Sequence, residues 1–198
     1  MQFIGKTAIF VALLAAAGLT VSAQTSKWQI DPAHSEADFT VRHMGIANVH
    51  GRFGNITGTL MLDEKDITKS STNTTIDTST LDSGVTQRDT HLKSADFFDV
   101  TKYPQMTFVS KSVSNNNGQL QLIGDLTIHG VTKSVTLALD GPSKEQQDPY
   151  GKTRRGFSAT TTIHRQDFGL VWNGNLKSGD AVVADDAKIE LDIELIKQ

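Results

Sequence analysis

The chain has 198 residues, a formal net charge of −3 and no cysteine. Without cysteine there can be no disulfide, no thiolate catalysis and no thiolate zinc site. A mildly acidic chain also lacks the clustered Lys and Arg that nucleic acid or an anionic lipid surface attracts. We therefore expect one domain, long enough for a sizeable core, and no nucleic-acid partner.

The first residues have the pattern of a secretory signal peptide. Lys6 precedes an almost unbroken apolar run from Thr7 to Val21, and small residues follow up to Ala23. The run of about 15 residues is shorter than the roughly 20 that span a bilayer. We expect cleavage after Ala23, an exported domain at residues 24–198 and no membrane-spanning segment once the signal is removed. The alternative is a retained N-terminal anchor.

Period-two alternation dominates the rest of the chain. It is clearest near the C-terminus, where Ile189 and Leu191 alternate with Lys188, Glu190 and their successors. A helix, with its period of 3.6, cannot place these two sets on opposite faces, so the runs predict strands. The predicted strands lie near residues 27–43, 51–63, 72–80, 105–114, 119–129, 131–140, 154–165 and 182–197. Their order and short links favour an antiparallel meander.

Turn residues separate the runs. Asn115 to Gly118 predicts a hairpin, because Asn and Gly tolerate positive φ, and Gly130 predicts a second one. Residues 85–100 break the alternation and predict a short helix or turn-rich cap across one barrel mouth. Residues 44–50 predict a second irregular stretch.

A sheet of this size with one apolar face needs cover. With so little helix available, it must pack on itself as a sandwich or close into a barrel. The interior of an eight-stranded barrel is filled by side chains or holds one slender ligand. The alternation alone leaves both possibilities open.

Several motifs resemble one bacterial family, that of the YceI-like polyisoprenoid-binding proteins. They occur in the family's order over nearly all of residues 24–198, at 28–35, 41–44, 51–53, 88–92, 97–100, 103–108, 124–133 and 165–169. The segment 172–186 carries less of the match. The resemblance implies an all-β fold, an extended antiparallel lipocalin-like barrel of about eight strands with a short helical cap. It also implies a periplasmic location and a long enclosed lipid.

Such a lipid would be an isoprenoid, an isoprenoid quinone or a fatty lipid, bound by a monomer or homodimer with no cofactor. The predicted lining residues are apolar and mostly aromatic. They are Phe39, Val41, Phe53, Phe97, Phe98, Met106, Phe108, Phe157, Ile163 and Phe168. The alternative for each is ordinary core packing, because a core and a cavity wall share the same alternation.

Polar candidates are few. The six histidines show no metal-ligand spacing, so we predict no metal site. Arg88, Asp89 and His91 are candidates for contact with a lipid head group at the barrel mouth. We predict no catalytic residue. The alternatives are an enzyme acting on a lipid or quinone head group, with Asp89 and His91 as a base and its orienting partner, and a ligand-free stress or interaction barrel.

Overall fold

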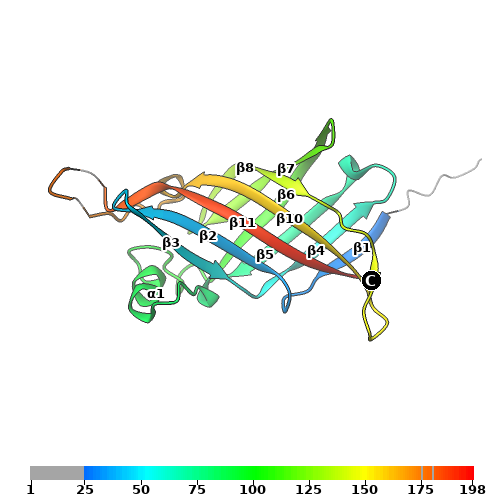
Figure 1. Cartoon of the computed structure of the whole chain (residues 1–198), viewed down its shortest axis with the longest axis horizontal. Coiled ribbons are helices and arrows are strands. Elements are labelled where there is room, and N and C mark those ends of the chain that lie inside the picture. The colour runs from blue at the N-terminus through cyan, green and yellow to red at the C-terminus, as the bar shows by residue number, and fades with distance from the viewer. Residues whose placement is uncertain (1–24, 175, 180) are drawn as a thin grey trace, which may run out of the picture.

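Antiparallel strands wound around one long axis make up most of the molecule, as Figure 1 shows. The computed structural model describes residues 25–174, 176–179 and 181–198. The predicted signal peptide at residues 1–23 and its cleavage after Ala23 lie outside the described residues. Within the described part of the chain, no helix is long and apolar enough to cross a membrane.

The strands are β1 (Thr25–Ile30), β2 (Glu36–His43), β3 (Ala47–Phe53), β4 (Ile56–Asp63), β5 (Ser71–Asp77), β6 (Gln105–Asn116), β7 (Gln119–Ile128), β8 (Val131–Asp140), β9 (Gln146–Gln147), β10 (Thr153–His164) and β11 (Val183–Lys197). The helices are α1 (Thr86–Lys93) and the short 3₁₀ helices η1 (Ile67–Lys69), η2 (Thr78–Thr80) and η3 (Arg165–Phe168).

Eight of these strands close into a barrel. Their order is β11, β1, β4, β5, β6, β7, β8 and β10, and β10 pairs back onto β11 from Arg154↔Ile196 to His164↔Asp186. The strands β2, β3 and β9 are additional, and α1 lies toward one end of the barrel (Figure 1). The predicted all-β, extended antiparallel barrel with a short helical cap is confirmed.

The strands β1 and β2 follow one another along the same edge of β11. Residues 28–30 of β1 pair with residues 195–197, and residues 36–41 of β2 pair with residues 187–192. The single strand predicted at residues 27–43 is therefore wrong. A turn interrupts it, because the Asp31 carbonyl accepts from the N–H of His34 at 3.2 Å and Asp31 Oδ1 accepts from the N–H of Ala33 at 3.0 Å. The β2–β3 hairpin attaches to β11, so the sheet is not a simple meander.

Other boundaries also differ from the predicted ones. The run at residues 51–63 divides at Gly54 and Asn55, where Asn55 has a φ of 50°. The irregular stretch predicted for residues 44–50 is wrong beyond the turn at 44–46, because β3 pairs with β2 from His43↔Ala47 onward. Residues 78–80 leave the strand predicted at 72–80 and form η2, whose first turn is capped by the Asp77 carboxylate.

Both predicted hairpins are present. Asn117 and Gly118 join β6 to β7 with φ values of 54° and 89°, and His129 and Gly130 join β7 to β8 with 51° and 77°. Two-residue loops with positive φ at both positions match the right-handed twist of the strands they connect. The local sequence is therefore sufficient to set these two turns.

The apolar phase of each strand faces the barrel interior. On β11, Ala187 and Leu195 are buried, whereas Lys188 and Glu190 on the other phase are exposed. The buried side chains form one large cluster around Trp28 and a smaller one on β6, β7, β8 and β10. The space that these two clusters leave between them contains the candidate site.

Candidate functional site

The inward-facing side chains enclose a cavity of about 430 Å³. Its wall includes Val183 at the start of β11 and Leu195 near the end of the same strand. These residues are 12 positions apart, which corresponds to about 40 Å of extended strand. The cavity is therefore long and narrow. Its volume falls in the range of roughly 300–1,000 Å³ that is usual for ligand sites.

The middle of the wall is apolar. Leu191 lines it and packs against both hydrophobic clusters. The neighbouring wall residues are Phe108, Leu122, Leu126, Val135, Leu137, Leu139, Phe157, Ala159, Ile189 and Ile193. Such a surface offers a hydrocarbon chain dispersion contacts and exclusion from water, and it offers few hydrogen bonds.

Most of the predicted lining residues lie on this wall. They are Phe39, Val41, Phe53, Phe97, Phe98, Met106, Phe108, Phe157 and Ile163. Whether these side chains contact a ligand stays a prediction.

Phe168 is the exception. It lies in η3, is only 2% exposed and packs within the large cluster behind the wall. It follows the end of β10 in a helical turn. The inward and outward alternation of a strand no longer decides its direction there.

Aromatic rings gather at the end of the cavity next to α1. The His91 ring lies edge-on against the rings of Phe97 and Trp172, with centroids 5.1 and 4.8 Å away. The centroids of Phe97 and Trp172 are 5.2 Å apart, and all three residues line the cavity. Leu92 joins the wall from the same helix. The helix α1 thus covers one mouth, as the sequence predicted.

The three polar mouth candidates do not act as one group. Arg88 and His91 line the cavity, whereas Asp89 does not. Asp89 Oδ1 accepts from the N–H of Ser83 at 2.8 Å and from its hydroxyl. His91 Nε2 is 2.9 Å from Asp96. An Asp89–His91 pair of base and orienting partner is therefore not formed.

Sequence reasoning missed Arg165 and Trp172 as wall residues. Arg165 is only 4% exposed, and Trp172 follows it across the short loop after η3. Neither residue belongs to a strand, so no alternation pointed to them. The wall residues of β11, such as Leu191, alternate clearly in the sequence but are not among the predicted lining residues, which are mostly aromatic.

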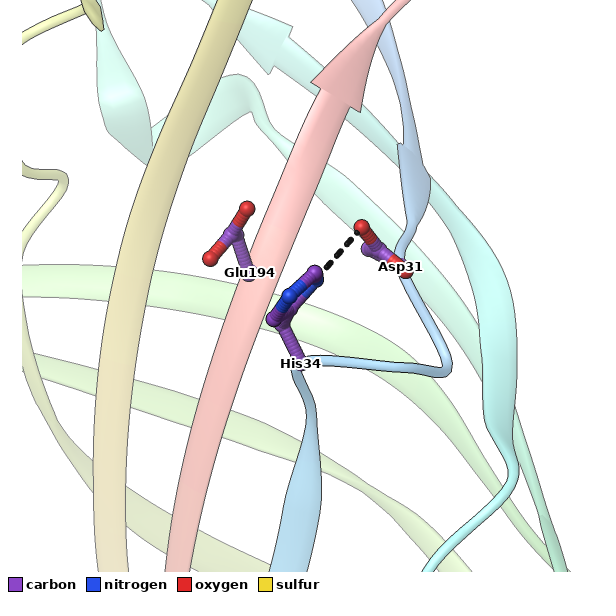
Figure 2. A group of neighbouring side chains, drawn as sticks. All are labelled: Asp31, His34 and Glu194. Carbon is purple, nitrogen blue, oxygen red and sulfur yellow. Dashed lines mark hydrogen bonds and ion pairs between the residues drawn. The ribbon is translucent and has the colours of Figure 1, made fainter. Parts of the chain in front are cut away.

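The opposite end of the barrel carries a charged cluster. Figure 2 shows Asp31, His34 and Glu194 gathered beside β11, with His34 Nδ1 3.0 Å from Asp31 Oδ2. Their ligand-type atoms all lie within 4.8 Å of one another, a spacing that would suit a metal ion. However, the Arg154 guanidinium contacts both Asp31, at 2.5 Å, and Glu194. A cation already neutralises these carboxylates, so the arrangement is an ion-pair network.

This network changes the acidity of Asp31. Its hydrogen bond to Arg154, and next that to His34, lower the pKa of the Asp31 carboxyl to about 2. The Arg154 guanidinium also binds Asp148 at 2.7 Å, which lowers the pKa of that carboxyl as well. The network therefore joins the β1–β2 turn, the loop before β10 and the strand β11.

A relative of known sequence matches nearly the whole chain. A UPF0312 protein of Vibrio parahaemolyticus is 38% identical over 197 residues, which is 98% of this chain and 100% of the relative. Among solved structures, BcnA of Burkholderia cenocepacia has a TM-score of 0.69 at 24% identity, covering 83% of this chain and 98% of BcnA.

A polyisoprenoid-binding domain of Saccharophagus degradans, implicated in plant cell wall breakdown, has a TM-score of 0.61 at 13% identity. The match covers 86% of this chain and 98% of that domain. At these identities the two structures show a shared fold. The model of the YceI-like domain matches residues 28–195. The chain therefore belongs to the family of YceI-like domain proteins.

Proposed function

We propose that the protein is a periplasmic binding protein that encloses the long apolar chain of an isoprenoid, an isoprenoid quinone or a similar lipid. Its role would be to carry or store that lipid in water. The observation that carries this proposal is the narrow apolar cavity along β11. The name of the Saccharophagus degradans domain supports the same ligand class, and the N-terminal apolar run supports export.

The energetics favour such a ligand. Each buried CH₂ contributes roughly 0.8 kcal/mol, so a few isoprene units already supply several kcal/mol. Losses of translational, rotational and chain freedom offset part of this gain. A long chain is therefore needed for firm binding, which agrees with a cavity that extends over most of β11.

Lipid extraction tests the proposed ligand. The full chain is expressed in a bacterium that makes isoprenoid quinones, purified without detergent and extracted with organic solvent. We expect mass spectrometry to find an isoprenoid or fatty lipid at close to one molecule per protein. A purified, folded barrel with no lipid above background would refute the carrier proposal.

Fractionation tests the proposed location. Cells expressing the full chain should release the protein with the periplasmic contents, and its mass should correspond to a chain that begins at Gln24. Recovery in the cytoplasm with residues 1–23 still attached would contradict export.

A further inference from the structure

Charge is unevenly distributed around the cavity. Among the residues that the structure describes, its wall includes Arg42, Arg88 and Arg165 but a single carboxylate, Asp38. Burial, and next the nearby Asp192, raise the pKa of Asp38. The whole chain carries a net charge of −3, so this excess of cations is local. Arg42 is exposed and is held by the carbonyl of Gly45 and by Asn48, which leaves Arg88 and Arg165 as the cations of interest.

Arg165 is a buried cation that lacks a close counter-ion. Its guanidinium donates to four main-chain carbonyls, those of Leu170, Trp172, Val183 and Ala184. Among the described residues, no carboxylate lies within salt-bridge distance of it. Asp185 acts on it only at longer range and is held by the N–H of Gln166 at 3.0 Å.

Carbonyl dipoles satisfy the donors of Arg165 without cancelling its charge. Burial accordingly lowers the pKa of this guanidinium, which still remains protonated. An unpaired charge in a poorly hydrated site is costly, and an anion placed nearby recovers part of that cost. The wall of the cavity next to Arg165 is therefore a favourable place for a negative group.

Arg88 adds a second guanidinium at the same end. Its Nε donates to the Ser83 hydroxyl at 2.7 Å and its Nη2 to the Ser83 carbonyl at 2.6 Å. Its Nη1 has no hydrogen-bond partner among the residues that the structure describes, and no carboxylate there forms a salt bridge with it. One edge of this guanidinium therefore has free donors.

Two histidines complete the group. His91 follows Arg88 by three positions on α1, so the two side chains share a helix face. The His91 ring contacts Trp172, whose carbonyl binds Arg165. His43 pairs in register with Val183, another residue whose carbonyl binds Arg165, and also lines the cavity. All four residues line the cavity. The Nε2 of His91 is at the same time 2.9 Å from the Asp96 carboxylate, so Arg88 and Arg165 are the two cations of the group without a salt-bridge partner among the described residues.

We propose that Arg88, His91, Arg165 and His43 form a site for an anionic head group, a carboxylate or a phosphate, on the lipid whose tail fills the cavity. This inference rests on the proposed carrier function and specifies its ligand class as an anionic amphiphile. Guanidinium groups suit both anions, because their paired N–H donors match two oxygens of a carboxylate or phosphate. The apolar wall binds the tail, and the cationic end sets the direction in which the lipid enters.

Chain-matched ligands test the head-group site. The protein, stripped of lipid, is loaded with the fluorescent apolar probe N-phenyl-1-naphthylamine. Oleate is then compared with oleyl alcohol, and farnesyl phosphate with farnesol, as competitors. We expect the anion of at least one pair to displace the probe at about tenfold lower concentration than its alcohol. The pair that shows the larger difference distinguishes a carboxylate from a phosphate.

Substitutions of single arginines test whether the preference for the anion comes from the proposed site. Arg88→Gln should remove most of the advantage of the anion and leave displacement by the alcohol unchanged, and Arg88→Lys should restore part of it. Arg52→Gln is the matched control, because Arg52 is an exposed cation that does not line the cavity. It should behave as the unmodified protein does.

The outcomes separate the two proposals. If alcohols and anions compete equally well, the head-group site is wrong and the carrier proposal stands. If neither kind of amphiphile displaces the probe, the carrier proposal fails, and the head-group site fails with it. Acetate and inorganic phosphate, which have no tail, should leave the probe bound. Displacement by these ions alone would overturn the assignment to a lipid head group.

Discussion

At the scale of single residues, Arg154 links the turn between β1 and β2 to the loop before β10 and to β11. It is 19% exposed and contacts Asp31, Asp148 and Glu194, which come from three separate segments. Charge-assisted hydrogen bonds of this kind are stronger than neutral ones. They hold the β1–β2 turn against β10 and β11, at the end of the barrel away from α1.

Replacing one carboxylate tests this role. Asp31→Asn should lower the free energy of unfolding at neutral pH by about 2 kcal/mol, the usual range for hydrogen bonds to charged groups. Because the folded-state pKa of Asp31 is lowered to about 2, its contribution is present above the ordinary pKa near 4 and is lost as the pH falls toward 2. The difference between the two proteins in urea unfolding should therefore shrink between about pH 4 and pH 2.

An exposed ion pair provides the control for Asp31→Asn. Asp125 pairs with Lys111 on the outer surface, where 37% and 55% of their side chains are exposed. Exposed pairs contribute little to stability, so Asp125→Asn should unfold almost as the unmodified protein does. A difference for Asp31→Asn that stays constant down to pH 2 would contradict the assigned role.

At the scale of elements, α1 is attached more loosely than any barrel strand. None of its eight residues is buried, and its N-cap residue Val85 makes no side-chain capping bond. Its attachments include the bonds of Arg88 and Asp89 to Ser83, the ring contacts of His91 and the packing of Leu92 against the large cluster. Segments with few buried contacts open at low free energy, so α1 is the part of the mouth that can move to admit a ligand.

Hydrogen exchange measures this difference. Amide hydrogens of α1 should exchange at least about 100-fold faster than those in the middle of β10 and β11, which pair along their whole length. Adding oleate should slow exchange in α1 and leave the exposed β6–β7 turn at Asn117 unchanged. Equal protection of α1 and the two strands would show that the helix is not a movable cap.

At the scale of the whole molecule, the long interior decides what the protein can bind. Leu191 lines the cavity and touches both hydrophobic clusters. Its neighbour Glu190 faces outward and is exposed. These adjacent positions allow the same substitution to be made on the two faces of one strand.

Filling the interior should abolish binding. Leu191→Trp places a larger ring in the cavity, so the lipid recovered after purification should fall at least about tenfold, while overpacking costs roughly 1–3 kcal/mol of stability. Glu190→Trp adds the same ring outside and should keep its lipid. Lipid content is measured by mass spectrometry and folding by circular dichroism. Unchanged lipid in a folded Leu191→Trp protein would show that the ligand lies elsewhere.

Short-range patterns were enough to predict much of this barrel. The alternation around Leu191 identifies a strand with one inward face, and the Asn117–Gly118 turn follows from backbone preferences alone. Most of the predicted wall residues, Phe39 and Phe108 among them, are on the wall for the same reason. Apolar alternation with a period of two is a local property of the sequence. It predicts the inward face correctly because successive side chains of a strand point to opposite faces of the sheet.

The remaining features of the fold and of the site depend on contacts between segments that are distant in the sequence. The β1–β2 turn is held against β10 by the contact of Asp31 with Arg154, which lies 123 positions away. Phe168 is not among the wall residues because it lies in η3, after β10 has ended. Arg165 reaches the cavity only because four carbonyls from two separate segments surround it. The width left between facing strands depends on how side chains from the whole circumference pack together. The order of apolar residues along the chain does not give the total volume of the side chains that meet inside the barrel. The cavity therefore follows only from the closed tertiary structure.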